Sequence, residues 1–295
     1  MRVPHNSAGK PIGDAQSRPL ISETECEKCK GLFSRIKSRF ASICIAKVSN
    51  DIEIKECVSL AELTACVDLQ REVFALPEVE LSPVRHFIVT KNAGGFALGA
   101  FDAGDLIGFV LSVPAFLRGE RAFYSHMTAV RPAYQSHGIG RRLKWAQRER
   151  SLEDGVRFVK WTFEPVKARN AYFNLEKLGA VVGEYAENFY GTDYVTAPEP
   201  AGTPIGLASD RLFAEWHLDS DRVVKLSRGE AAPSASEPLV KIGIPDDWLG
   251  LVKADRSKAF DEQIRIREEF QAAFGRGLVA RGFNRDGELP QYLLS

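Results

Sequence analysis

One stretch of the sequence combines an apolar run, a glycine turn and a basic helix, and this combination can bind phosphate. The run Ala122–Val130 (AFYSHMTAV) predicts a buried strand, which Pro132 prevents from continuing. The turn QSHGIG follows at 135–140. Such a turn leaves N–H groups of a helix N-terminus unpaired and directed at one point, which is how proteins hold a pyrophosphate. A nucleotide-bearing cofactor is the first hypothesis; a turn that needs glycine only for its backbone conformation is the alternative.

The signatures of the commoner nucleotide sites are absent from the sequence. No Gly-Lys-Ser/Thr follows the turn, as a phosphate loop of a nucleoside triphosphatase would require, and no Gly-x-Gly-x-x-Gly of a dinucleotide-binding protein is present. ATP and NAD are therefore not favoured as ligands.

Longer phrases around the turn resemble one enzyme superfamily. They are SHMTAVRPAYQSHGIGRRLKWAQRE, WTFEPVKARNAYFNLEKLGA, NFYG at Asn188–Gly191 and DRLFAEW at Asp210–Trp216. The order of elements resembles the GNAT superfamily of acyl-CoA-dependent N-acyltransferases. The phrases resemble its branch of predicted acetyltransferases found beside N-acylamino acid racemases, where an amino-acid N-succinyltransferase role has been proposed. The resemblance runs from about Asp51 to the C-terminus.

The resemblance implies both a fold and a co-substrate. The fold would be mixed α/β (α+β): a mostly antiparallel sheet with helices on both faces, whose central strand and next strand splay apart to admit the cofactor. The co-substrate would be acetyl-CoA or another acyl-CoA, with no metal. Its pyrophosphate would lie on the glycine turn, and its pantetheine amides would pair with the end of the central strand. The residues that match these positions are Thr128, Ala129, Val130, Gln135, Ser136, His137, Gly138, Ile139, Gly140 and Arg141.

Two side chains are candidates for accepting the proton of an amine substrate. Glu164 directly follows the expected strand 157–163, and its alternative role is an ordinary ion pair with Lys167 or Arg169. His126 lies two residues before Thr128, on the same face of an extended strand, and imidazole titrates near neutral pH. We rank His126 second, because a histidine in an apolar strand is more often hydrogen-bonded core. No Ser-His-Asp or Cys-His pattern stands out, so direct transfer is favoured over an acyl-enzyme.

The sequence departs from the family where the general acid is usually found. Many GNAT enzymes carry a tyrosine four residues before the glycine of the Leu-Gly pair, but this chain has Leu175 there. The asparagine often found seven residues before that tyrosine position is replaced by Ala168. Tyr172 on the same helix and Tyr190 are the remaining hydroxyls, and Tyr172 or water is the expected proton donor.

The leading functional hypothesis is therefore an enzyme that moves an acetyl or succinyl group from acyl-CoA to a small amine, with an amino acid as a plausible acceptor. Arg131, Arg169 or Arg211 could bind a substrate carboxylate. A non-catalytic acyl-CoA-binding sensor or interaction module is the alternative from another class, and the missing tyrosine is its main support. Acylation of a protein N-terminus or lysine is a third hypothesis.

The elements that must position these residues follow from periodicity. A GNAT-like core is expected over 51–195, with a strand at 52–56, a helix at 60–74 and a hairpin of 95–102 with 106–114 joined by Gly104-Asp105. The strands 122–130 and 157–163 and the helices from 139 and over 168–178 complete it.

Residues 196–295 are expected to form a C-terminal extension that packs on the core. It should contain a strand at 211–218, a linker at 227–238, a helix and a last strand at 278–283. The aromatic stripe of that helix would be Phe260, Ile264, Arg267, Phe270 or Gln271, and Phe274. Residues 1–50 are expected to be a partly disordered tail with a short helix.

Composition limits the partners and the compartment. Lys plus Arg and Asp plus Glu are equal at 39 each, so no net field favours nucleic acid or a membrane. The basic run in 141–150 predicts a solvated helix face. No apolar run of about 20 residues and no signal-peptide core occurs, and the odd count of 5 cysteines favours a reducing compartment, so a cytoplasmic protein is expected. A zinc site at Cys26 and Cys29 would need two more ligands. A homodimer is left open.

Overall fold

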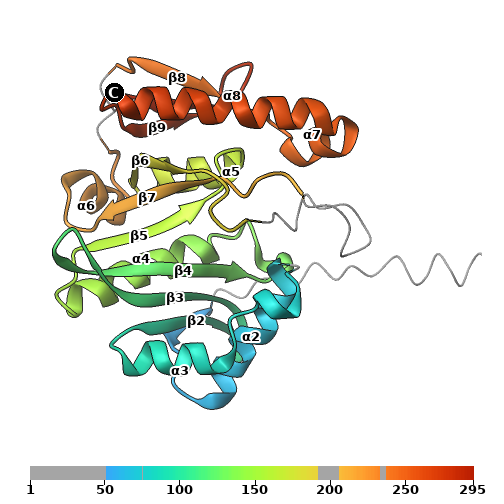
Figure 1. Ribbon diagram of the computed structural model, residues 1–295. Coiled ribbons are helices and arrows are strands. Elements are labelled where there is room, and N and C mark those ends of the chain that lie inside the picture. Colours follow the sequence, from blue (N-terminus) through green and yellow to red (C-terminus); the bar gives the residue numbers. More distant parts are fainter. Residues whose placement is uncertain (1–50, 75, 192–205, 233–236) are drawn as a thin grey trace, which may run out of the picture. The chain divides into compact units, whose positions relative to one another are not determined.

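The computed structural model describes residues 51–74, 76–191, 206–232 and 237–295 (Figure 1). The chain divides into two compact units, Met1–Ile45 and Ala46–Ser295, and all described residues belong to the second. The expected N-terminal tail, its short helix and the pair Cys26 and Cys29 lie outside the described residues.

The first part of the unit is a strand, two helices and three antiparallel strands. Ser59 and Glu62 form a capping box at the start of the first helix, where the Glu62 amide donates to Ser59 Oγ at 3.2 Å and the Ser59 amide donates to Glu62 Oε2 at 3.0 Å. The second helix was not predicted, because only Phe87 and Thr90 of its residues are buried. The elements are β1 Glu53–Glu56, α2 Leu60–Phe74, α3 Val84–Asn92, β2 Phe96–Asp102, β3 Asp105–Leu117 and β4 Glu120–Val130.

The hairpin between β2 and β3 turns one residue earlier than predicted. Asp102 pairs with Asp105, so the two turn residues are Ala103 and Gly104, with φ of 49° and 92°. Two successive residues with positive φ are typical of a type I′ turn, whose twist matches that of the strands. Asp105 is therefore already the first residue of β3.

The central strands separate as the resemblance implied. β4 and β5 (Phe158–Phe163) are parallel and pair only at Phe123 with Val159 and at Tyr124 with Lys160. The rest of β4, from Ser125 to Val130, has no register partner on β5. These strands are joined by α4 Ile139–Glu153, and β5 is followed by α5 Ala168–Tyr172, a π-helical turn Phe173–Lys177 and β6 Val181–Ala186.

Helices cover both faces of this part of the sheet. Phe109 and Leu111 of β3 pack with Leu63 of α2 and Phe87 of α3. Ile107 and Val110 of β3 pack in a second cluster, which contains Leu143 of α4. Because neighbouring residues of a strand point to opposite faces, α2 and α3 lie on one face and α4 on the other.

The basic run of α4 is not simply a solvated face. Lys144 is buried, with Nζ 3.8 Å from the ring centre of Trp161 and 3.1 Å from Ser125 Oγ. Burial lowers the pKa of Lys144 well below its usual value. Gln147, also buried, accepts from Lys144 and donates to Ser112 Oγ at 2.7 Å. A polar network therefore links α4 to both β3 and β4.

The residues after 205 enlarge the same sheet. β7 Arg211–His217 lies between β5 and β6, and the ten-stranded order is β1-β2-β3-β4-β5-β7-β6-β9-β10-β8. Apart from β4 with β5, every pair recorded for the described strands is antiparallel. The expected boundary at 195/196 lies outside the described residues, so the division into domains stays a prediction. The other elements are α6 Asp221–Ser227, β8 Val240–Gly243, α7 Trp248–Ala254, α8 Arg256–Gly275, β9 Ala280–Asn284 and β10 Gln291–Leu294.

The long helix α8 uses a different face from the one predicted. Phe260 is 50% exposed, and the buried residues are Ala259, Gln263, Ile266, Phe270 and Ala273. Of the predicted aromatic stripe, Phe270 is fully buried and contacts Tyr292 at 4.9 Å between ring centres. The small residues on the buried face allow α8 to approach the sheet closely, which a count of aromatic positions does not reveal.

Candidate functional site

The glycine turn presents a row of unpaired backbone amides. Gly138 has φ of 80°, and Ser136 has φ of 67°. The first amide to pair with the turn is that of Arg142, which donates to the Gly138 carbonyl at 3.0 Å. Among the described residues, none accepts a hydrogen bond from the amides of 136–141. Residues 136–138 are exposed, so these amides are open to a ligand.

Side chains hold the turn against the end of β4. Gln135 Nε2 donates to the Val130 carbonyl at 3.0 Å, and His137 Nδ1 lies 2.8 Å from the Gln135 carbonyl. Arg169 of α5 donates to Ser136 Oγ at 3.4 Å. One carbonyl at the end of β4 is thus already paired, and Arg169 lies at the turn.

His126 does not share a face with Thr128, because a β-bulge lies between them. Met127 pairs with Leu111 and Ser125 with Ser112, so β4 has one more residue than β3 here. Thr128 pairs with Val110, whose side chain packs on the α4 face. The His126 ring lies instead beside Ser82 and His86, on the other face, with Nε2 3.0 Å from Ser82 Oγ. The predicted shared face assumed regular alternation, which the bulge interrupts.

The surroundings of His126 keep its ring neutral. Burial, and secondly the neighbouring His86, lower the pKa of His126 to about 4. The two rings are 5.2 Å apart. The ring is held by Ser82 and His86 on the face opposite Thr128, so Glu164 stays ahead of His126 as the candidate base.

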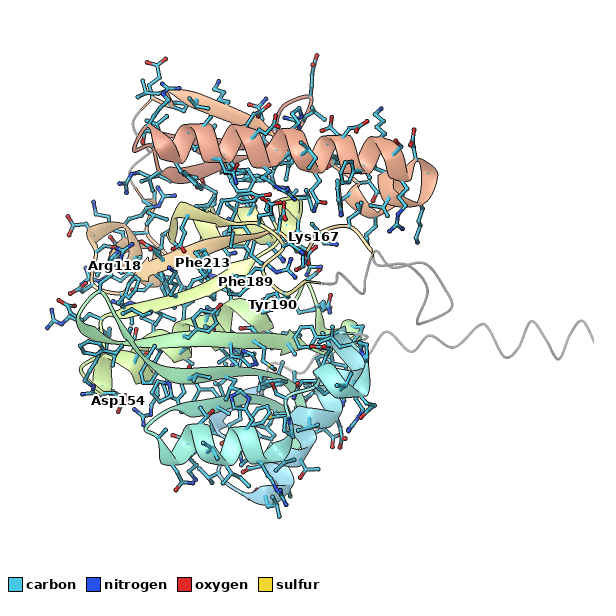
Figure 2. The ribbon with its side chains drawn as sticks, in the orientation of Figure 1. Arg118, Asp154, Lys167, Phe189, Tyr190 and Phe213 are labelled. Atoms are coloured by element: carbon cyan, nitrogen blue, oxygen red, sulfur yellow. The ribbon has the colours of Figure 1, made fainter. Side chains whose placement is uncertain are left out.

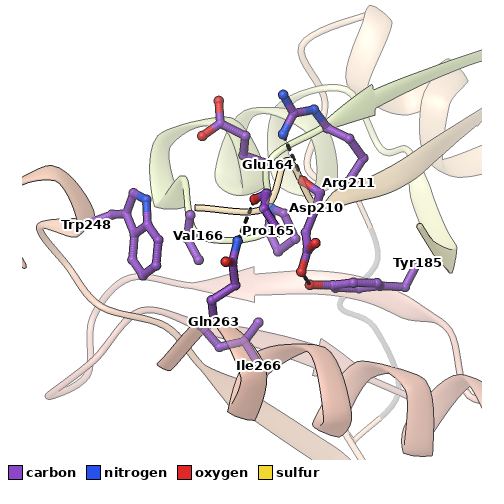
Figure 3. Close-up of a pocket in the computed structure, with 10 residues that line it drawn as sticks. Glu164, Pro165, Val166, Tyr185, Asp210, Arg211, Trp248, Gln263 and Ile266 are labelled. Carbon is purple, nitrogen blue, oxygen red and sulfur yellow. Dashed lines mark hydrogen bonds between the residues drawn. The ribbon is translucent and has the colours of Figure 1, made fainter. Parts of the chain in front are cut away.

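Glu164 lies at the end of β5 and lines a small pocket (Figure 3). Its Oε2 is 3.6 Å from Lys167 Nζ, the ion pair considered from the sequence. Phe163 pairs with Leu212, so Glu164 and Arg211 extend from adjacent ends of β5 and β7. The other lining residues are Pro165, Val166, Tyr185, Ala208, Asp210, Trp248, Gln263 and Ile266.

A cluster of hydroxyl groups lies on the same face as Glu164. Thr162 Oγ1 and Tyr190 OH are 3.1 Å apart, and the Arg211 guanidinium lies 5.1 Å from the ring centre of Tyr190. Burial, and secondly the neighbouring Tyr190, raise the pKa of the Tyr124 hydroxyl. The hydrogen bond with Thr162 and the positive charge of Arg211 lower this pKa and offset part of the rise. The sequence reasoning did not identify Tyr124 or Thr162, although Thr162 alternates with Glu164 along β5.

Tyr190 is held in place by the turn that carries it. Ser209 Oγ accepts from the Tyr190 amide at 2.8 Å. Phe189 packs on Phe213 of β7 at 5.4 Å between ring centres, and Figure 2 shows Phe189 and Tyr190 beside this strand. The NFYG phrase thereby forms one side of the cluster.

Asp210 fixes this turn to α8. Its side chain is only 2% exposed and accepts from Tyr185 OH at 2.5 Å, from the Asn188 amide at 2.9 Å and from Arg267 Nε at 3.0 Å. A buried carboxylate is stable only when paired and hydrogen-bonded in this way. The Asp210 of the DRLFAEW phrase is therefore a structural residue that positions Asn188–Gly191.

Tyr172 contacts two cationic side chains and not the candidate site residues. Its ring lies 4.9 Å from Lys177 Nζ and 5.3 Å from the Arg285 guanidinium. None of its recorded contacts within the described part of the chain is to Glu164, His126 or the turn. Leu175, at the usual position of the tyrosine, is fully buried in the core. Neither Tyr172 nor the usual tyrosine position, occupied by Leu175, therefore places a hydroxyl beside Glu164 or the turn.

The described ranges contain neither a metal-binding cluster of side chains nor a membrane-spanning helix. No cluster of three or more His, Cys, Asp or Glu side chains suited to a metal ion occurs there. No helix of these ranges has both the length and the apolar character needed to span a bilayer.

Comparison with known proteins identifies the family of the central segment. Residues 63–180 match the model of the acetyltransferase (GNAT) family. No curated protein matches the chain.

Several solved structures are similar to the chain. One is the ribosomal-protein-S18-alanine N-acetyltransferase from Escherichia coli, with 16% identity, TM-score 0.45, and coverage of 57% of this chain and 95% of that one. Another is a GNAT family acetyltransferase from Elizabethkingia anophelis with acetyl-CoA bound, with 17% identity, TM-score 0.44, and coverage of 57% and 99%. A third is the acetyltransferase of GNAT family from Streptococcus pneumoniae, with 17% identity, TM-score 0.43, and coverage of 56% and 98%.

The family match extends from α2 to the residue before β6, and it contains the splayed strands, the glycine turn and Glu164. Over residues 63–180 the chain therefore matches the GNAT acetyltransferase family.

Proposed function

We propose that the protein transfers an acetyl or succinyl group from acyl-CoA to the amine of a small molecule, with an amino acid as the acceptor. The observation that carries this proposal is the run of unpaired amides at 136–141, whose residues 136–138 are exposed, beside the part of β4 that has no partner on β5. The amino-acid acceptor is supported by the resemblance to acetyltransferases found beside N-acylamino acid racemases. The odd number of cysteines supports a cytoplasmic setting.

The chain offers a cradle for the phosphates and an edge for the pantetheine arm. The amides of 136–141 would bind the pyrophosphate, and the positive end of the α4 helix dipole would favour its negative charge. Backbone groups of Thr128 and Ala129 would pair with the pantetheine amides. The Val130 carbonyl contributes less, because Gln135 already donates to it.

Transfer requires a neutral amine and a route for its proton. The bound acyl-CoA supplies a thioester, whose carbonyl carbon the amine nitrogen attacks; the C–N bond forms and the C–S bond breaks. The proton of the attacking amine passes to Glu164, directly or through water. Water protonates the departing thiolate, because the cation contacts of Tyr172 are with Lys177 and Arg285 and not with the residues of the turn.

A thiol-release assay tests the proposal. Purified full-length protein is mixed with acetyl-CoA or succinyl-CoA and a panel of amino acids, and free CoA and the N-acyl product are measured. Release of CoA that depends on the added amine is the expected result. No release with any amine, under conditions in which acyl-CoA binds, would contradict it.

That contrary outcome would support a second function, a non-catalytic acyl-CoA-binding sensor. The observation that favours the sensor is the buried Leu175 at the usual tyrosine position. Calorimetric binding of CoA without turnover is its expected signature.

A further inference from the structure

The three arginines that could bind a substrate carboxylate differ in their surroundings. Arg131 Nε is 3.1 Å from the carboxylate of Glu72, so its charge is already paired. Arg169 contacts Ser136 in the glycine turn and therefore faces the phosphate cradle. Among the described residues, Arg211 has neither a carboxylate partner nor a contact with the glycine turn. It donates from Nη1 to the Asp210 carbonyl at 2.9 Å and stacks on the Tyr190 ring.

The charge of Arg211 is not balanced by a carboxylate of any described residue. Its neighbours on this face are all paired. Lys160 forms an ion pair with Glu184 at 2.5 Å, Arg267 with Asp210 at 3.0 Å, and Lys167 with Glu164 at 3.6 Å. A partly buried guanidinium that is stacked but left without an anion suits an anion supplied by a ligand.

The groups around Arg211 complete a site for a carboxylate. The guanidinium is a planar fork of donors that matches the two oxygens of a carboxylate, and stacking on Tyr190 holds its plane. The hydroxyls of Tyr190 and Thr162 lie on the same face. One of them donates to the other, so at most one O–H group of the pair remains to donate to a ligand. Glu164 lines the same pocket as Arg211 and provides the opposite charge for an ammonium group.

We propose that Arg211, held by Tyr190, binds a carboxylate of the substrates and makes the enzyme selective for carboxylate-bearing molecules. This inference rests on the proposed N-acyltransferase function. The carboxylate can come from two sources. One is the α-carboxylate of an amino-acid acceptor, whose amine then lies toward Glu164. The other is the free carboxylate of a succinyl donor.

The experiment combines two donors with two acceptors. The donors are acetyl-CoA and succinyl-CoA. The acceptors are an amino acid turned over in the panel and the amine that lacks its carboxylate, for example phenylalanine with 2-phenylethylamine or alanine with ethylamine. Initial rates give kcat and KM for all four combinations, with wild-type protein and the variants Arg211→Met and Arg211→Lys.

With an acceptor carboxylate, Arg211→Met should raise the KM for the amino acid about 10- to 100-fold with either donor, as expected for a lost charge-assisted hydrogen bond. Its rates with the decarboxylated amine should stay within about 3-fold of wild type. If Arg211 instead binds the carboxylate of the succinyl donor, Arg211→Met should remove the preference for succinyl-CoA over acetyl-CoA with both acceptors. Arg211→Lys keeps the charge without the fork, and it should recover part of the lost selectivity in either case.

Arg157→Met is the matched control. Arg157 precedes β5 at its opposite end and is 74% exposed, where it pairs with Asp219. Its variant should behave as wild type, and thermal unfolding should show that all variants are folded.

Two results would overturn the inference while leaving the proposed function in place. One is a wild-type enzyme that acylates decarboxylated amines as efficiently as amino acids and does not prefer succinyl-CoA. The other is an Arg211→Met variant with equal losses in all four combinations. Failure of the proposed function is a separate outcome, because wild-type protein would then release no CoA with any acceptor.

Discussion

At the scale of single residues, a carboxylate and a guanidinium that no carboxylate of the described residues balances lie at adjacent strand ends. Among the described residues, Lys167 is the one charged partner of Glu164, at 3.6 Å, and a substrate ammonium could replace that contact. His126 is confined by Ser82 and His86 on the far side of a bulge. Glu164 is therefore the residue that we propose for proton transfer.

Glu164→Gln should lower kcat by about 10²- to 10⁴-fold, the usual contribution of a general base. The variant should also lose the pH dependence that this carboxylate confers on kcat/KM. Glu164→Asp keeps the charge and should retain more activity, and Glu120→Gln, at an exposed site, serves as the control. Unchanged turnover and pH profile in Glu164→Gln would exclude Glu164 as the base.

His126 should make the protein less stable in mild acid. Its pKa is about 4 in the folded protein against 6.5 in the unfolded chain. Between these values the unfolded chain binds a proton that the native state does not, so stability decreases as the pH falls from about 6.5 to about 4. The loss is at most about 3 kcal/mol. Urea unfolding of wild type and His126→Asn across this range measures it, and an identical pH dependence in both proteins would refute it.

At the scale of elements, the β4–turn–α4 unit is the part of the fold that can bind a pyrophosphate. Its conformation depends on Gly138, whose φ of 80° is disfavoured for residues with a side chain. A Cβ at Gly138 would meet no atom within 4 Å, so the requirement for glycine comes from the backbone and not from packing. The network of Lys144 and Gln147 attaches α4 to the strands beside the bulge.

Gly138→Val should weaken CoA binding at least 10-fold, because the strained residue would redirect the amides of the turn. Titration calorimetry with CoA gives the dissociation constant. Gly155→Val is a matched control, since Gly155 follows the other end of α4, has φ of 73° and is equally open. Both variants should lose a similar amount of stability, about 1 to 2 kcal/mol, but only Gly138→Val should lose CoA affinity. Equal CoA affinity in the two variants would contradict the cradle.

At the scale of the whole described unit, the C-terminal helix supports the site from outside the family segment. Arg267 of α8 reaches Asp210 and Glu187, and Asp210 in turn holds the turn that carries Tyr190. Gln263 of α8 donates to the Ala208 carbonyl at 2.7 Å, next to the same segment. The residues beyond 205 therefore support the side of the site that we propose for the acceptor.

Arg267→Met should destabilise the protein by about 3 kcal/mol, because it leaves the buried Asp210 carboxylate without its cation. It should also raise the KM for the acceptor by displacing Tyr190. Arg265→Met provides the control: Arg265 lies two residues earlier, is 37% exposed and pairs with Glu262 and Glu269, so its loss should cost less than about 1 kcal/mol. Chemical denaturation and acceptor kinetics measure both effects. Equal effects of the two substitutions would refute this role of α8.

The sequence alone predicted the features that depend on local signals. The helix over 60–74 has the predicted bounds, since its capping box and periodicity lie within one segment. The β4–turn–α4 order and the residues of the turn were predicted for the same reason: a proline, two glycines and an apolar run act on neighbouring residues. The separation of β4 and β5 was predicted only through the family resemblance.

Tertiary structure alone decided the features that arise between distant segments. The place of β7 between β5 and β6 depends on pairing with strands about 30 and 50 residues away, which no local pattern encodes. The bulge at His126 arises from the register between two strands, and the buried face of α8 depends on the strands that it covers. The same holds for Arg211. Its residue type can be read from the sequence. That no carboxylate of the described residues pairs with it cannot be read there, because the partners of a side chain are selected only when the chain has packed.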